Sequence, residues 1–200
     1  MGSPAQAKYQ AGASLAAHIR SAVADARLRP ITRQQSQAFA HASLVALVAA
    51  WDSYLNELAR NFYTETANPG DAAFRSIYEI ARSESRRVGR RFNTPNWNNS
   101  RDFLVRTTGF DPISSWVWPA RGMGALQVQE RMNQILKVRH SFAHGSQIPS
   151  YSWNRSPTGR VRLNQTVLKE TEGFFNNLVK RTDVGMKNYL RAVFGRHVPW

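Results

Sequence analysis

The stretch from Gln37 to Thr66 restricts the fold of this chain more than any other feature. Its apolar side chains recur at steps of three and four, which places them on one face of an α-helix. They are Leu44, Leu47, Val48, Trp51, Tyr54, Leu55, Leu58 and Phe62. A stripe of this length must be covered by other elements along the whole helix. The pattern therefore predicts a core helix with Thr32 or Ser36 as its N-cap.

Shorter patterns of the same kind predict the other helices. We expect an alanine-rich helix over 5–28 that packs on a core bundle of residues 36–195, and helices over 72–91, from 99 or 100 to 107, and up to His144. A last helix should cover 165–194, with a break near Thr182 and Asp183, because Gly173 and Gly185 weaken it. The fold class predicted is an all-α, antiparallel helical bundle in one domain, residues 1–200. The polar segment 148–163 is expected to form a short β-hairpin or a functional loop.

The charge of the chain indicates its partner. There are 27 Lys and Arg residues against 13 Asp and Glu residues, which gives a net charge of +14. A positive surface of this size attracts polyanions, so nucleic acid is favoured over an acidic protein or a membrane surface. The absence of cysteine excludes disulfides and thiolate metal sites. Neither a bilayer-spanning apolar run nor a signal-peptide pattern is found, so a cytoplasmic location with no membrane contact is expected.

Two segments concentrate arginine. Arg82, Arg86 and Arg90 repeat every four residues along one predicted helix, with few acidic residues nearby, and form a candidate phosphate-binding ridge. A solvated helix face is the alternative. In the predicted loop, aromatic residues alternate with arginines in a way that suits single-stranded RNA, although a purely structural hairpin would also fit. The loop residues expected to bind RNA are Tyr151, Trp153, Arg155 and Arg160.

The helix that ends near His144 carries the strongest candidate site. Val128, Met132, Ile135 and Phe142 line one helical face, and Arg139 continues the same stripe. An arginine in that position needs an anionic partner, a subunit interface or an open cleft beside it. On an ideal helix, residues five apart differ by about 140° in direction. Arg139 and His144 can therefore reach one substrate only from a distorted last turn or from two sides of a groove.

The segment Arg139-His140-Ser141-Phe142-Ala143-His144 resembles the Arg-x4-His signature of the HEPN superfamily of ribonucleases. Trp51-Asp52-Ser53-Tyr54 and Phe92-Asn93-Thr94-Pro95-Asn96 are similar to patches of its RiboL-PSP-HEPN subgroup. The resemblance implies an all-α, metal-independent endoribonuclease that acts as a homodimer, with two signatures facing one cleft. It also implies a toxin or phage-defence role, with an antitoxin or another regulatory protein as a candidate partner.

Residue types in the signature suit RNA cleavage without a metal. The 2′-hydroxyl attacks the adjacent phosphorus and leaves a 2′,3′-cyclic phosphate, and histidine can transfer the protons because its ordinary pKa is about 6.5. We expect His144 to be the principal acid or base, Arg139 to hold the phosphate, and His140 to orient the substrate or supply a second proton-transfer group. His140 and His144 have the spacing of a metal pair, but no third ligand is evident, so neither a metal nor another cofactor is predicted. The rival hypothesis is a non-catalytic HEPN module that binds RNA, a nucleotide or a partner protein.

Overall fold

The described part of the chain is helical. The structure, a computed structural model, describes residues 2–24, 30–67, 72–145 and 147–200. Its helices are α1 (Pro4–Ala22), α2 (Arg33–Thr66), α3 (Ala72–Arg91), α4 (Trp97–Thr108), α5 (Ala125–Ala143) and α6 (Gln165–Phe194), with the short 3-10 helices η2 (Pro119–Arg121) and η3 (Ser152–Asn154). In these residues β-pairing is limited to two isolated bridges, one of which joins Arg155 and Val161. The predicted all-α class is confirmed, and the predicted hairpin over 148–163 is reduced to that bridge.

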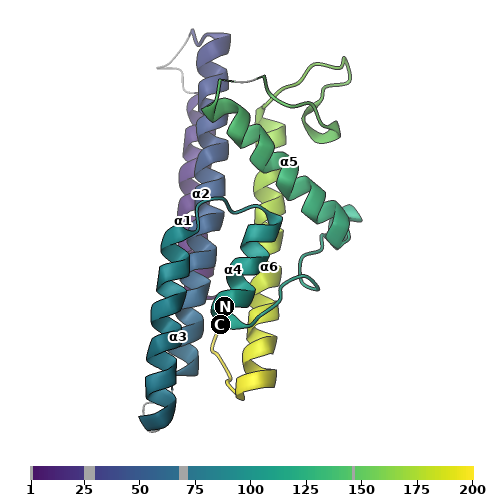
Figure 1. Cartoon of the computed structure of the whole chain (residues 1–200). Helices are drawn as coiled ribbons and strands as arrows, with labels where there is room; N and C mark the ends of the chain where they lie inside the picture. Colours follow the sequence, from purple (N-terminus) through teal and green to yellow (C-terminus); the bar gives the residue numbers. More distant parts are fainter. Residues whose placement is uncertain (1, 25–29, 68–71, 146) are drawn as a thin grey trace.

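Helix α2 is the centre of the fold, as its apolar stripe predicts. It contacts α1, α3, α4, α5 and α6, and Trp51 and Leu55 on it are fully buried. In Figure 1, α2 and α6 run along most of the length of the molecule, and α1 lies beside the upper and middle part of α2. Helix α3 follows the lower part of α2, and α5 crosses the upper part obliquely. A capping box between Thr32 and Gln35 starts α2, which identifies Thr32 rather than Ser36 as the N-cap.

A buried carboxylate joins three helices. Asp183 of α6 is 7% exposed and accepts hydrogen bonds from the Tyr54 hydroxyl of α2 at 2.8 Å and from the Ser3 hydroxyl and backbone N–H at 2.9 Å each. Ser3 is also the N-cap of α1. Burial, and then the charge of Asp183, hold the pKa of Tyr54 well above its ordinary value, so the phenol remains a donor. These bonds fix the positions of α1, α2 and α6 relative to one another.

The break predicted in α6 near Thr182 and Asp183 is wrong. The helix is continuous because both residues are held by buried partners: Trp116 donates to the Thr182 hydroxyl at 2.9 Å, and Tyr54 donates to Asp183. Gly185 is present for a packing reason, since a Cβ there would lie 2.8 Å from the ring of Phe110. Tertiary contacts thus override the low helix propensity of glycine.

Other expectations need smaller corrections. Helix α1 ends at Ala22, before the expected end at 28, and residues 25–29 lie outside the described part. Asn96, not Asn99 or Ser100, caps α4. The helical spacing of Phe74, Ile77 and Tyr78 predicts that all three face inward from α3. Ile77 is instead 70% exposed, because α3 packs only on α2 and α4 among the helix pairs with appreciable contact. The segment Asn68-Pro69-Gly70-Asp71, whose residue types predict a turn, lies outside the described residues.

Among the described helices, α2 alone is long and apolar enough to cross a membrane by length and composition. Of its most apolar window, 56% is buried inside the protein. Its apolar residues are covered by the neighbouring helices. This is the environment of a core helix.

We predict that Asp183→Ala lowers the free energy of unfolding by about 2–4 kcal/mol, because Ser3 loses its buried acceptor and Tyr54 keeps only the longer bond to the Val179 carbonyl at 3.2 Å. Urea denaturation followed by circular dichroism measures the change. Asp102→Ala, which removes an exposed carboxylate, is the matched control and should change the unfolding midpoint little. Equal effects of the two substitutions would show that the buried carboxylate does not hold the three helices together.

Candidate functional site

The candidate site lies where α5 ends. The helix stops at Ala143 with His144 as its C-cap, at φ −104° and ψ 8°, and Gly145 follows in the left-handed region at φ 63°. This termination agrees with the prediction from the sequence. His144 is exposed, whereas Arg139 and His140 are half-buried. At ψ 8° the backbone of His144 departs from helical values, so the regular helix ends before this residue.

The electrostatic environment of the site is positive. The pKa of His140 is lowered from its ordinary 6.5, mainly by burial and further by the charges of Arg139 and His144. His140 is therefore neutral over a wider pH range than a free histidine, and neutral imidazole can accept a proton. Arg139 has neither a hydrogen bond nor an ion pair with any described residue. The signature thus combines a proton acceptor with an arginine that is available to an anion.

His41 of α2 is a neighbour of the signature that the sequence did not reveal. Its ring stacks on Phe142, with centroids 4.0 Å apart and planes at 16°. His41 is 4% exposed, its Nδ1 has no described hydrogen-bond partner, and burial lowers its pKa. Only a contact between residues a hundred positions apart places it here, so no local pattern could have found it. Phe142 itself is 46% exposed, which corrects the expectation that it continues the buried stripe.

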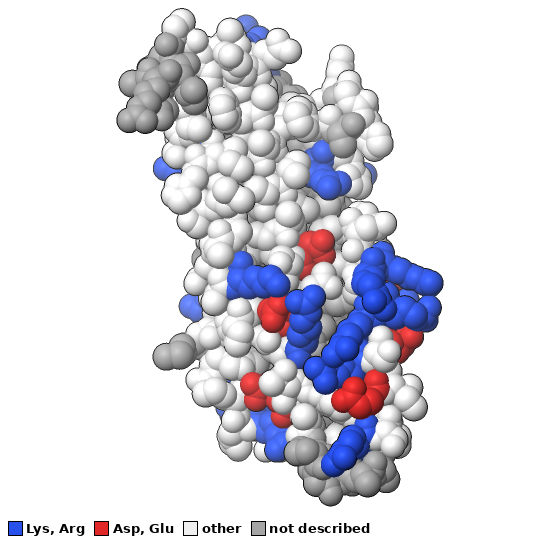
Figure 2. Space-filling model, turned by 90° about the vertical axis from the view of Figure 1, so that its left-hand side faces the viewer, with Lys and Arg blue, Asp and Glu red and all other residues white. Residues whose placement is uncertain are grey.

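The arginine ridge lies on a different part of the molecule. Figure 2 shows Lys and Arg side chains gathered on the lower half of one face, where Figure 1 places α3 and the end of α2. Arg82, Arg86 and Arg90 line a groove of about 570 Å³ between these two helices, together with Arg60 of α2. The sequence pattern identified the three arginines of α3. It missed Arg60, because the packing of α3 on α2 brings it to the groove.

The loop after α5 packs back onto that helix. Trp153 donates from Nε1 to Gln134 at 2.8 Å, and its ring covers the guanidinium of Arg131 at 4.2 Å. Arg131 is 7% exposed, and burial lowers its pKa to about 10. One face of Trp153 is therefore already occupied by protein, and Tyr151 stacks beside it at 6.2 Å.

The arginines of the same loop face solvent. Arg155 is exposed and donates to the Ser150 hydroxyl, and Arg160 is exposed. The structure thus keeps these two cations accessible, while the rings of Tyr151 and Trp153 are half-buried. Binding of RNA by this loop stays a prediction that depends more on its arginines than on its rings.

Two of the three sequence patches that resemble the HEPN subgroup have structural roles. Trp51 is fully buried and donates to the Ser100 hydroxyl at 3.3 Å. The side-chain oxygen of Asn96 accepts from the backbone of Asn99 at 2.8 Å and starts α4. Trp97 then donates from its backbone to Asn133 of α5 at 3.4 Å. The bond from Trp97 to Asn133 connects the start of α4 to α5, the helix that ends in the signature.

No group of three or more His, Cys, Asp or Glu side chains within the described ranges is arranged to hold a metal ion. His140 and His144 therefore have no third described ligand of these types beside them. The polar chemistry at the end of α5 is that of one arginine and neighbouring histidines.

An all-α bundle with Arg139 and His144 at the end of one helix defines a HEPN-type domain. The family model described as RiboL-PSP-HEPN matches residues 14–188. The chain belongs to the RiboL-PSP-HEPN family. Neither the search of curated proteins nor the search of solved structures returned a match. Family membership indicates a nuclease or RNA-related role, because HEPN domains are generally ribonuclease-like.

We predict that Arg139→Ala raises the pKa of His140 toward its ordinary value, because a neighbouring positive charge that opposes protonation is removed. Burial persists in the variant, so the pKa should remain below 6.5. A histidine ring NMR titration of the two proteins measures the difference. An unchanged His140 pKa would mean that the Arg139 guanidinium lies too far from the imidazole for the two to act on one phosphate.

Proposed function

We propose that this protein is a metal-independent endoribonuclease whose reaction centre is formed by Arg139, His140 and His144. The observation that carries the proposal is the end of α5, where an arginine free of described partners lies beside two histidines in a chain of a ribonuclease-like family. The net charge of +14 favours RNA as the substrate.

The proposed reaction is an attack of the 2′-hydroxyl on the adjacent phosphorus. A neutral histidine accepts the hydroxyl proton, the new P–O bond forms, and the bond to the 5′ oxygen breaks as that oxygen takes a proton from a second group. The products are a 2′,3′-cyclic phosphate and a 5′-hydroxyl. His144 acts as principal acid or base and His140 as the second group, while Arg139 stabilises the charge that builds on the phosphoryl oxygens.

A homodimer is part of the proposal. Phe142 is 46% exposed at the end of a helix face whose earlier members, Val128, Met132 and Ile135, are completely buried. An exposed aromatic ring beside Arg139 suits a subunit interface that borders a shared cleft. Two signatures facing one cleft would also bring an arginine and a histidine together from different directions. The 140° between Arg139 and His144 within one helix then presents no obstacle.

We further propose that the enzyme acts in the cytoplasm as a toxin or phage-defence effector, controlled by an antitoxin or another regulatory protein. This setting is supported by the family alone. Arg155 and Arg160 of the loop after α5 are proposed to contact RNA near the site, with Tyr151 and Trp153 holding the loop on α5.

The second candidate function is an HEPN module that binds RNA, a nucleotide or a partner protein without cleaving. The observation that favours it is the stack between the buried His41 ring and Phe142. Packing alone explains the aromatic ring of the signature, without any role in catalysis. Binding without product formation distinguishes this function from the first.

We predict that the purified protein cleaves RNA in EDTA and that His144→Ala and Arg139→Ala each lower the rate by about 10²–10³ or more. Both variants should keep the wild-type melting temperature, because neither side chain has a described hydrogen bond. Cleavage is followed on labelled RNA. The 2′,3′-cyclic phosphate is detected because a product that carries it cannot be ligated at its 3′ end until the cyclic phosphate has been hydrolysed and removed. His18→Ala, an exposed histidine of α1, is the control. Full activity in both motif variants would exclude the proposed site.

We predict that mixing Arg139→Ala with His144→Ala protein restores activity to about a quarter of the wild-type level, because half of the dimers are mixed and each has one intact centre. This holds only if each centre takes its arginine and histidine from different subunits. The mixture is refolded or co-expressed and assayed on the same RNA. Activity no higher than that of the separate variants would place both groups of each centre on one chain.

A further inference from the structure

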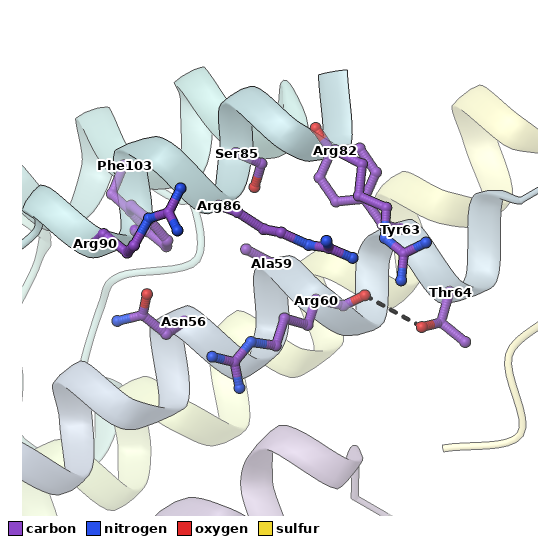
Figure 3. A pocket seen from close by; sticks show the side chains of 11 residues that line it. Asn56, Ala59, Arg60, Tyr63, Thr64, Arg82, Ser85, Arg86, Arg90 and Phe103 are labelled. Carbon is purple, nitrogen blue, oxygen red and sulfur yellow. Dashed lines mark hydrogen bonds between the residues drawn. The ribbon is translucent and has the colours of Figure 1, made fainter. Parts of the chain in front are cut away.

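The groove between α2 and α3 concentrates positive charge that the proposed reaction does not use. Figure 3 shows the Arg86 side chain reaching into the space between the two helices, with Arg60, Arg82 and Arg90 around it. The residues that line this space include no Asp or Glu. Four arginines in one groove repel each other, so an anion placed among them would be bound favourably.

The four arginines differ in their existing partners. Arg60 is 3.1 Å from Glu57, and Arg82 is 3.5 Å from Glu79, both in exposed pairs within one helix. Such pairs are weak and readily exchanged for a stronger anion. Arg86 and Arg90 have no ion pair or hydrogen bond with a described residue. These two side chains are therefore available to a ligand without breaking any described contact.

The groove offers charge but no platform for a base. The two aromatic residues in its lining are Tyr63, which is 8% exposed, and Phe103, which is 3% exposed. Phe103 stacks on Phe92 with centroids 4.7 Å apart, and the Tyr63 hydroxyl donates to backbone carbonyls. A base therefore has no exposed ring on which to stack. What remains is recognition of phosphates by guanidinium groups, which carries no sequence information.

The distance from the signature to the groove is set by α2. His41 marks the level of the signature through its stack with Phe142, and the groove extends from Asn56 to Thr64. With 1.5 Å of rise per residue, the groove begins roughly 22 Å and ends roughly 35 Å along the helix from that level. At about 3.4 Å per nucleotide in a stacked strand, these distances correspond to roughly six to ten nucleotides.

We propose that the groove between α2 and α3 is a second RNA-binding site that holds the phosphate backbone about six to ten nucleotides from the scissile bond. This inference rests on the proposed ribonuclease function and defines its substrate class. The substrate is an RNA strand long enough to occupy both sites at once, whereas a short oligonucleotide occupies only one site at a time. Arg86 and Arg90 are the principal contacts.

Binding to RNAs of two lengths tests the proposal. The parent protein carries His144→Ala so that no RNA is cut. The probes are labelled RNAs of about four and about twenty nucleotides. The first is shorter and the second is longer than the span between the two sites. The added substitutions are Arg86→Ala and Arg90→Ala. The matched control carries Lys169→Ala and Lys180→Ala, which remove the same charge from exposed positions of α6 that do not line the groove. Fluorescence anisotropy is measured over a series of salt concentrations.

The groove variant should bind the long RNA about tenfold more weakly at 0.15 M salt, and its salt slope should fall by about 1.4, because two single-strand phosphate contacts are lost. Its affinity for the short RNA should fall by no more than about twofold, because a short RNA gains nothing from the link between the two sites. The control should resemble the parent protein on both probes. An equal loss on both lengths, or an equal loss in the control, would overturn the proposal. A competition experiment gives a further contradicting outcome. If millimolar mononucleotide displaces the long RNA from the control protein but not from the groove variant, the groove is a nucleotide pocket and the proposal is overturned.

The same two arginines can be tested in the active protein. With His144 intact, the substitutions should raise KM for the long RNA about tenfold and leave kcat unchanged, because they lie far from the reacting phosphate. If the protein cleaves no RNA, the proposed function fails. The binding series with the His144→Ala protein still decides whether the groove holds RNA.

Discussion

The hydrogen bonds to the Asp183 carboxylate are the interaction on which the rest of the structure depends. They connect α6 to the middle of α2 through Tyr54 and to the start of α1 through Ser3. A buried carboxylate is costly unless donors surround it, so these contacts specify one arrangement of the three long helices. Helix α2 is then fixed, and it carries both the neighbour of the signature, His41, and one wall of the arginine groove.

The chemistry of the signature follows from where α5 stops. Gly145 ends the helix, and the charge of His144 acts on His140. Three cationic or titratable groups at one helix end would repel each other if all were charged. The lowered pKa of His140 relieves this repulsion and leaves Arg139 as the permanent positive charge. An RNA phosphate is the type of ligand that would complete this environment.

Much of the fold could be predicted from the sequence because its determinants are local. The stripe that includes Trp51 and Leu55 gave the central helix, and Gly145 marked the end of α5. The break expected near Thr182 was wrong because the contacts that keep α6 continuous are not local. Glycine propensity is a small local term, and the buried bond from Trp116 to Thr182 outweighs it. Ile77 was misplaced because periodicity shows which residues share a face but not which part of that face has a neighbour.

For the candidate site, the sequence alone determined that an arginine and two histidines stand at the end of one helix, and that the chain has an excess of positive charge. Their spacing is set by the helical repeat, which is local. The tertiary structure decided that His41 stacks against the signature, that Arg60 joins the arginines of α3, and that Trp153 rests on Arg131. Each of these contacts joins residues on different elements. Such contacts exist only after the apolar faces of the helices have packed, and no pattern within a single helix encodes them.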